Sequence, residues 1–216
     1  MAEPVKRRYN SPLREQQRRQ TRLRILDAAS RLFLEHGYPA TTMEAVAADA
    51  GVATDTVYAA FSTKRALLKE VMDVTVAGDD RDLKVYERED AQAMRRDTDQ
   101  RHQIVGFAAG VTSRMERVRP LDDVMRSAAA VDAEVAALRR DVQLRQRREG
   151  MQMFVSSLTA NGPLRDGLQV DDAISITWTL TSPEVHRLLR VDSGWTIERY
   201  VRWLTATLTD SLLPRE

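Results

Sequence analysis

The sequence predicts an all-α protein built from two helical parts. Apolar residues recur at spacings of three and four through most of the chain, which is the period of a helix packed on one face. Glycine and proline fall where these patterns stop. Residues 174–181 alternate strictly between apolar and polar, as a strand does, but no other segment offers a convincing partner strand. We therefore expect a helix there too, and we divide the chain into 1–70 and 71–216.

The first helix is expected to start at Ser11-Pro12 and to end at Gly37. Serine caps a helix well, proline suits the first helical position, and glycine is common just past the last turn. On this helix Arg14, Arg18 and Arg22 are spaced four apart and share one stripe.

Three short helices are expected next. Thr41 to Glu44 has the pattern of a capping box, with Thr41 as the cap, before a helix over 43–50. A helix over 54–60 follows, and another begins near Ser62 or Thr63.

Residues 43–62 fit a helix-turn-helix. Ala47 is small where the second helix would cross, and Gly51 can adopt the positive φ of a tight turn. Val46, Val52 and Val57 would fill the wedge between the helices. In this motif the second helix enters the DNA major groove. An ordinary helical hairpin would show the same spacing.

Charge is unevenly distributed along the 216 residues. The whole chain has a net charge of +1, but the first 24 residues hold eight basic and two acidic side chains, a net charge of +6 that leaves −5 for the rest. A basic arm of this kind is typical of polyanion binding, or of a solvated tail. Its position beside the helix-turn-helix favours DNA.

The second part is expected to consist of longer helices. Residues 78–102 are rich in charge and read as the domain junction, with a short helix around 85–94. Beyond it we expect helices over about 99–118, closed by Pro120, then 121–130, 132–160, 170–190 and 195–212.

The N-terminal third resembles the TetR-type transcriptional regulators. The resemblance rests on Thr41-Thr42-Met43, on the run from Gly51 to Phe61, and on Lys64 with Leu67-Leu68. It implies a three-helix helix-turn-helix DNA-binding domain followed by a helical effector-binding and dimerisation domain. It also implies a homodimer that binds a palindromic operator in double-stranded DNA and represses transcription until a small molecule binds.

By position, the resemblance also implies roles for individual residues. Phosphate contacts fall to Thr42, Thr56, Tyr58 and Lys64, whose hydroxyls and ammonium can bond phosphate oxygens. Base-facing positions are Met43, Ala53, Thr54, Asp55, Ala59 and Ala60. Because alanine offers only methyl contacts, direct readout is expected to be sparse. Arginines of the N-terminal arm are then expected to contribute: Arg7, Arg8, Arg14 and Arg18.

The same resemblance assigns candidate residues to the second part. The effector pocket would be lined by Phe107, Met115, Met125, Met151, Phe154 and Trp178, although each of these also fits a plain helical core. The last two helices would form the dimer interface through Ala173, Ile176, Leu180, Val201, Leu204 and Leu208.

Catalytic and metal-binding patterns are not found in the sequence. Cysteine is absent, and the three histidines, His36, His102 and His186, show no ligand spacing. The acidic pairs at 122–123 and 171–172 are read as helix starts, where the dipole favours them. We expect no enzyme, no metal, no cofactor, no membrane span, and a cytoplasmic location. The alternative to a DNA-binding regulator is a small-molecule-binding helical protein without a DNA role.

Overall fold

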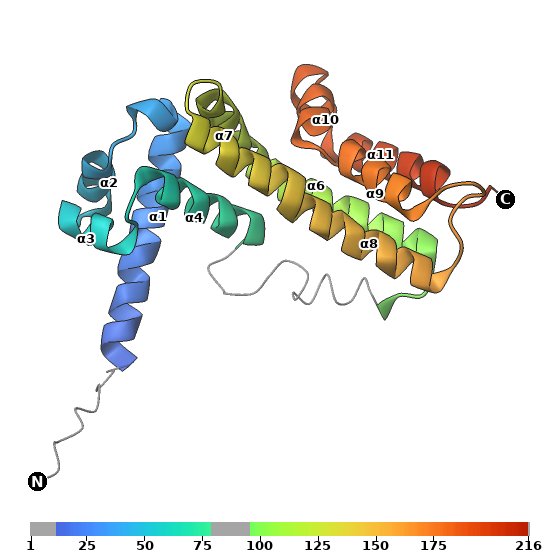
Figure 1. Cartoon of the computed structure of the whole chain (residues 1–216), viewed down its shortest axis with the longest axis horizontal. Helices are drawn as coiled ribbons and strands as arrows, with labels where there is room; N and C mark the ends of the chain where they lie inside the picture. The colour runs from blue at the N-terminus through green and yellow to red at the C-terminus, as the bar shows by residue number, and fades with distance from the viewer. Residues whose placement is uncertain (1–11, 79–95, 216) are drawn as a thin grey trace, which may run out of the picture. The chain divides into compact units, whose positions relative to one another are not determined.

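The computed structural model describes residues 12–78 and 96–215, and within these ranges the secondary structure is helical with no strand. The all-α prediction is confirmed (Figure 1). The strand-like alternation at 174–181 lies almost entirely in helix α9 (Val170–Leu180). The chain divides into two compact units, one ending at Val71 and the other beginning at Met72.

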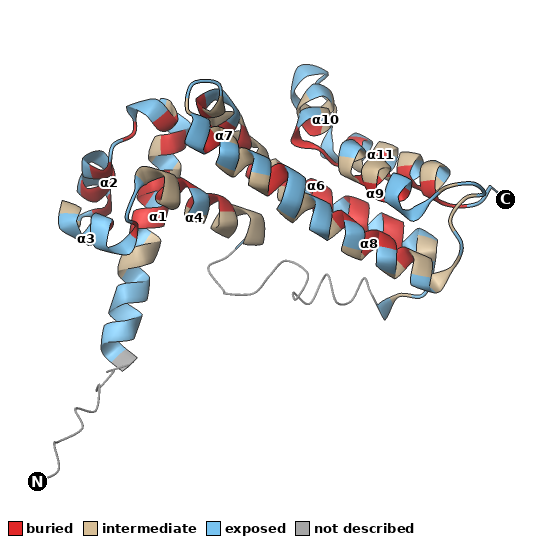
Figure 2. Cartoon of the chain, in the orientation of Figure 1, coloured by how far each residue is buried: buried red, intermediate tan, exposed pale blue. Residues whose placement is uncertain are grey.

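The first unit is organised on α1 (Pro12–Ala40). Gly37 interrupts this helix with a positive φ of 77°, so the predicted stop at Gly37 is confirmed as a break, followed by one further turn. Ile25, Ala29 and Phe33 are completely buried. Residues 13–20 are exposed throughout, and Figure 2 shows this end of α1 in pale blue.

The helix-turn-helix consists of α2 (Met43–Ala50) and α3 (Thr54–Ala60). Between them Gly51 has φ 64° and ψ 43°, the left-handed conformation that the sequence predicted. Val46, Ala47 and Val57 are at most 2% exposed, because the two helices close over them. Val46 and Val57 are buried in the wedge as predicted, whereas Val52 is only half-buried.

The cap of α2 differs from the prediction. The Thr42 hydroxyl, not that of Thr41, accepts the backbone N–H of Ala45 at 3.1 Å. Thr41 is buried instead, and its hydroxyl lies 2.8 Å from the carbonyl oxygen of Gly37, where it can donate to the end of α1. With two adjacent threonines, the position of the cap was misassigned by one residue. The next helix, α4 (Lys64–Ala77), begins as predicted after a cap at Thr63, which accepts the N–H of Ala66.

The second unit begins at Met72, within α4, and the short helix predicted at 85–94 lies outside the described residues. Helix α6 (Gln100–Ala129) continues through Pro120, so the predicted break there is wrong. Val118, Leu121 and Met125 are at most 5% exposed on either side of the proline. This continuous packing offsets the backbone hydrogen bond that proline cannot donate.

The segment predicted as one helix over 132–160 is continuous but not uniform. It consists of α7 (Ala133–Arg140), a π-helical segment η2 (Asp141–Gln146) and α8 (Arg147–Asn161). Segments of π-helix are rare and occur mainly as local bulges within α-helices.

The predicted helix over 170–190 is divided. After α9, Ser182 caps a new helix, α10 (Pro183–Arg187), with Pro183 in its first turn. A second π-helical segment, η3 (Leu188–Asp192), leads to α11 (Ile197–Leu212). A proline lacks the N–H that would continue α9, and it is pre-set to start a new helix.

The core of the second unit is formed mainly by α6, α8, α9 and α11. The Phe107 and Phe154 rings stack with centroids 3.7 Å apart between α6 and α8. Tyr200, Leu204, Leu208 and Leu212 form the inner face of α11 and are at most 1% exposed.

We predict opposite effects for two glycine-to-alanine substitutions. Gly51→Ala should lower the free energy of unfolding by about 1 kcal/mol, because alanine is strained at a positive φ. Gly110→Ala, in the exposed middle of α6 with no atom near the added methyl group, should raise it by up to about 1 kcal/mol. Urea unfolding followed by circular dichroism measures both, and a stabilising Gly51→Ala would contradict this account of the turn.

Candidate nucleic-acid interface

Helix α3 is exposed to solvent, and most of its side chains are small. Asp55, Thr56, Ala59 and Ala60 are exposed, as is Ala53 just before the helix, and Thr54 is half-buried. Only Val57 is buried, and it holds α3 against α2. Seven of the residues predicted to contact phosphate or bases are therefore exposed, since Thr42 and Tyr58 are exposed as well.

Met43 is an exception among the predicted base-facing residues. Its side chain is 4% exposed and belongs to the core beneath α2. The family resemblance implied a base-facing role for this position, but the apolar side chain is buried. Met43 is therefore withdrawn from the base-facing set.

Tyr58 and Glu44 connect the two helices on the outer face. The Tyr58 hydroxyl lies 3.4 Å from Oε1 of Glu44, and the tyrosine as a whole is 45% exposed. The negative charge of Glu44 raises the pKa of the Tyr58 hydroxyl, so the hydroxyl remains a hydrogen-bond donor. The pKa of Glu44 is lowered, first by its own backbone N–H and then by Thr42.

Lys64 serves a structural role that the sequence did not indicate. Its ammonium donates to the carbonyl oxygens of Tyr38 and Thr41, both at 2.8 Å, and lies 3.4 Å from that of Pro39. It also lies 4.4 Å from the centroid of the Tyr38 ring. These contacts join the start of α4 to the end of α1. The predicted phosphate contact of Lys64 would compete with them.

The arginines that form the stripe on α1 differ in their contacts. Arg22 forms an ion pair of 2.5 Å with Glu70 on α4, and its guanidinium lies 4.5 Å from the Phe61 ring, directly after α3. Arg14 and Arg18 are exposed and form no ion pair with a described residue. Arg7 and Arg8 lie outside the described residues.

The six residues predicted to line an effector pocket are packed into the second unit. Phe107, Met151 and Phe154 belong to its main apolar cluster, against which Trp178 packs. Met115 and Met125 are at most 5% exposed. Their placement agrees with the alternative that each belongs to a helical core.

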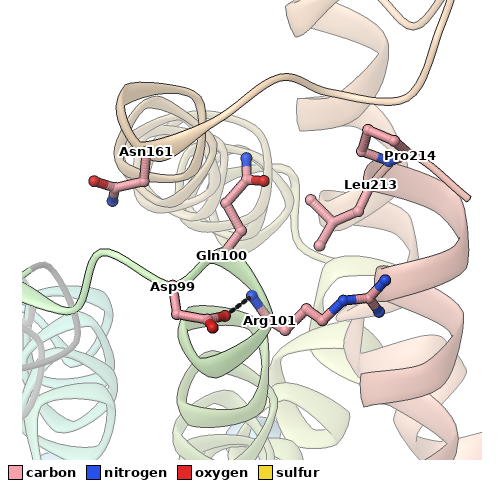
Figure 3. A pocket seen from close by; sticks show the side chains of 6 residues that line it. All are labelled: Asp99, Gln100, Arg101, Asn161, Leu213 and Pro214. Carbon is pink, nitrogen blue, oxygen red and sulfur yellow. Dashed lines mark hydrogen bonds between the residues drawn. The ribbon is translucent and has the colours of Figure 1, made fainter. Parts of the chain in front are cut away.

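An open pocket of about 330 Å³ lies elsewhere, where the start of α6 meets the ends of α8 and α11 (Figure 3). It is lined by Asp99, Gln100, Arg101, Asn161, Leu213 and Pro214. The polar side chains of Asp99, Gln100 and Asn161 form hydrogen bonds with the backbone. Asp99 accepts the N–H groups of Arg101 and His102 and so caps α6, while the Gln100 amide donates to the Leu158 carbonyl. None of the six predicted pocket residues borders it.

The predicted dimer interface is largely turned inward. Ala173, Leu204 and Leu208 are completely buried within the chain's own core, so they cannot form a surface between two copies. Ile176, Leu180 and Val201 remain half-buried. The apolar stripes of α9 and α11 exist as predicted, but their central residues pack within the second unit.

A buried polar network joins α6 to the π-helical segment η2. The sequence did not indicate this network. Asp122 is 2% exposed in the middle of α6, not at a helix start as predicted. It accepts two hydrogen bonds from Arg139, at 3.1 and 3.0 Å, and one from Gln143 at 2.9 Å. Arg139 also pairs with Glu184 at 2.8 Å. By contrast, Asp171 and Asp172 do lie in the first turn of α9.

Gln143 continues this network to Arg147 and Trp178. The Arg147 guanidinium donates to Oε1 of Gln143 and to the carbonyl oxygen of Trp178, and the Trp178 indole donates to the Gln143 carbonyl at 2.9 Å. Burial lowers the pKa of Arg147 to about 10. No carboxylate of a described residue pairs directly with Arg147. The surroundings of this guanidinium are not obvious from the sequence, because its partners come from η2 and from α9.

His186 forms a second buried cluster. It is completely buried, with Nε2 2.9 Å from Oε1 of Glu116, which also binds Arg190 at 2.7 Å. Its ring meets that of Tyr200 edge-on with centroids 5.1 Å apart, and its Nδ1 has no hydrogen-bond partner among the described residues. Burial lowers the pKa of His186, against the opposing charge of Glu116.

The described residues contain neither a candidate metal site nor a membrane span. No three of their acidic or histidine side chains converge as a metal site would require. None of their helices is long and apolar enough to cross a membrane.

A helix-turn-helix with an exposed second helix, ahead of a separate helical unit, defines the class of helix-turn-helix regulators. Residues 25–71 match the model of the bacterial regulatory proteins of the tetR family. The resemblance seen in the sequence is thereby confirmed for the helix-turn-helix domain. No curated protein matches the chain.

Solved structures extend the likeness over most of the chain. One from Mesorhizobium loti MAFF303099, assigned to the TetR family, is 18% identical and has a TM-score of 0.69 over 89% of this chain and 95% of its own. A transcriptional regulator from Saccharomonospora viridis in complex with choline is 17% identical, with a TM-score of 0.66 over 91% and 100%. The SmeT–triclosan complex is 19% identical, with a TM-score of 0.63 over 89% and 91%. At these identities the similarity shows the fold.

We predict that Lys64→Met destabilises the first unit. Removing the ammonium leaves the carbonyl groups of Tyr38 and Thr41 without their donor, at a cost of about 2 kcal/mol. Arg24→Met, at an exposed position on α1, is the control and should change stability by less than about 0.5 kcal/mol. Equal unfolding midpoints in urea for the two variants would refute the structural role of Lys64.

We also predict that the protein loses stability as the pH falls below 6.5. Because burial lowers the pKa of His186, the unfolded chain binds a proton more readily between pH 6.5 and the lowered folded value. Glu116 has a lowered pKa owing mainly to Arg190, and its contribution is lost only below pH 4.5. Thermal melting at pH 7.5, 6.0 and 5.0 should show a smaller loss for His186→Gln than for the wild type. An identical loss in both proteins would rule out His186 as the source.

Proposed function

We propose that the protein is a ligand-responsive transcriptional regulator that binds a two-fold symmetric DNA operator as a homodimer, acts as a repressor, and is released by a small molecule. The single observation that carries this proposal is the exposed α3, set against α2 by the Gly51 turn and the buried Val57. The match of residues 25–71 to the tetR family supports it.

The proposed DNA contacts follow from exposure. Hydroxyls of Thr42, Thr56 and Tyr58 contact phosphates, while Ala53, Thr54, Asp55, Ala59 and Ala60 face the bases. Phosphate contacts fix the position of α3 in the groove without reading sequence. The small side chains on α3 allow a close approach to the base edges and give few polar contacts. Asp55 can accept from the amino group of cytosine.

The effector is proposed to bind in the second unit. Two structures of similar fold contain choline or triclosan, which supports ligand binding by proteins of this shape. In this chain Trp178 is a candidate wall of the site. It is half-buried, and it lies beside a guanidinium whose direct partners are all neutral. A ligand acts on DNA binding only by binding one conformation of the protein more tightly than another.

The proposed dimer uses the half-buried rims of α9 and α11, where Ile176, Leu180 and Val201 lie, in place of their inner stripes. A dimer is needed because two copies of α3 must sit about one DNA turn apart to contact the two halves of a symmetric site. The proposed location is the cytoplasm, where operator DNA is accessible.

The proposal predicts salt-sensitive, sequence-preferring DNA binding that depends on the hydroxyls of α3. Fluorescence anisotropy should show that the protein prefers DNA from the region upstream of its own gene over unrelated DNA of equal length. Thr56→Val and Tyr58→Phe, which each remove one hydroxyl, should weaken binding about fivefold, a loss typical of one hydrogen bond. The slope of affinity against salt should not change, because no charge is removed.

The control is Thr159→Val, which removes an exposed hydroxyl from α8 in the second unit. This variant should leave DNA affinity unchanged. Equal affinity for the upstream and unrelated DNA would contradict the proposed function. It would favour the alternative, a small-molecule-binding helical protein without a DNA role.

A further inference from the structure

The start of α1 is a helical segment that lies open to solvent in the part of the chain that the structure describes. From Leu13 to Gln20 every residue is exposed, and the first buried residue is Ile25. These residues are arginine, glutamine, glutamate and leucine, all strong helix formers. Propensity alone gives only marginal stability to a short helix in water. This exposed segment gains further stability if it is held against a partner.

The direction of its arginines is fixed by Arg22. Side chains four apart share a helix face, and the row winds by only about 40° for each four residues. Arg22 lies on the side of α1 that faces the end of α3, since its guanidinium is 4.5 Å from the ring of Phe61. Arg18 and Arg14 therefore continue the row beyond α3 on the same side. Figure 1 shows α1 extending past α3.

The length of this row of arginines can be compared with the spacing of base pairs in DNA. At about 1.5 Å per residue, Arg14 lies roughly 12 Å along the helix from Arg22. That length spans three to four base pairs at about 3.4 Å each. Neither Arg14 nor Arg18 is neutralised by an acidic side chain of the described residues. Their charges complement a row of phosphates.

We propose that the exposed start of α1 is a rigid DNA-backbone clamp, in which Arg14 and Arg18 bind phosphates that flank the segment contacted by α3. Arg22 takes no part in the clamp, since it is bound to Glu70 and Phe61 and sets the direction of the row. This inference rests on the proposed function, because it requires that α3 binds DNA. It extends the contacted DNA beyond each half-site by a few base pairs.

The test compares two duplexes that carry the same operator. One ends at the edges of the symmetric site, and the other continues for six further base pairs on each side. The double variant Arg14→Ala/Arg18→Ala should bind the long duplex about tenfold more weakly than the wild type. For a dimer its salt slope should fall by about 4, since four phosphate contacts are lost. On the short duplex, variant and wild type should bind equally.

Three controls separate the clamp from other effects. Alanine favours helix, so circular dichroism should show an intact α1 in the double variant. Arg14→Lys/Arg18→Lys retains both charges and should keep the salt slope on the long duplex. Arg24→Ala removes an exposed charge that lies about 200° around α1 from Arg22, and it should not alter the preference for the long duplex.

The outcomes distinguish this inference from the function on which it rests. The clamp is wrong if the double variant binds the long duplex as the wild type does, or if it loses equal affinity on both duplexes. In either case Thr56→Val would still weaken binding to both duplexes, and the proposed function would stand. If the wild type shows no preference for either operator duplex over unrelated DNA, the proposed function fails and the clamp fails with it.

Discussion

The helix-turn-helix depends on one ammonium group that holds its two ends together. Lys64 lies at the first turn of α4, and its ammonium donates to the carbonyl of Tyr38 in the last turn of α1 and to that of Thr41 just after it. The chain between these anchors contains α2, the Gly51 turn and α3. With both ends fixed, the buried faces of Val46 and Val57 close on each other, and the outer face of α3 remains exposed. The accessibility of the proposed DNA surface follows from this arrangement.

The second unit is organised differently, around polar groups within an apolar core. Asp122 and Arg139 are both largely removed from water, and their paired hydrogen bonds make this burial tolerable. Gln143 forms hydrogen bonds with Asp122, Arg147 and Trp178 and so links them. Because these residues lie on α6, on the π-helical segment η2 and on the two helices that follow, a ligand that displaced Trp178 would disturb contacts on all of them. Buried networks of this kind specify one arrangement and penalise others.

Much of the fold could be predicted because the helical spacing of apolar residues is visible in the sequence. The turn at Gly51, the small Ala47 and the interruption at Gly37 each follow from local sterics. The errors arose where distant packing prevailed over a local signal. Pro120 fails to stop α6 because Val118, Leu121 and Met125 remain buried around it. Leu204 and Leu208 form an apolar stripe that fits a dimer interface equally well, and only the neighbouring helices show that it faces inward.

The site could be predicted only in part for the same reason. Exposure of Thr56 and Tyr58 follows from the position of Val57 in α3, which the motif provides. Lys64 contacts carbonyl groups about 25 residues away in the sequence, and the spacing of residue types cannot indicate such a contact. The pairing of Asp122 with Arg139 across 17 residues was hidden because adjacent aspartates suggest a helix start.

Selection of binding sites from a pool of random DNA tests the central claim most directly. The claim is that α3 of each of two copies occupies adjacent major grooves on one face of the double helix. The account predicts enrichment of a two-fold symmetric sequence whose half-sites are centred about 10 base pairs apart. Recovery of no common sequence, or of one that lacks two-fold symmetry, would contradict it.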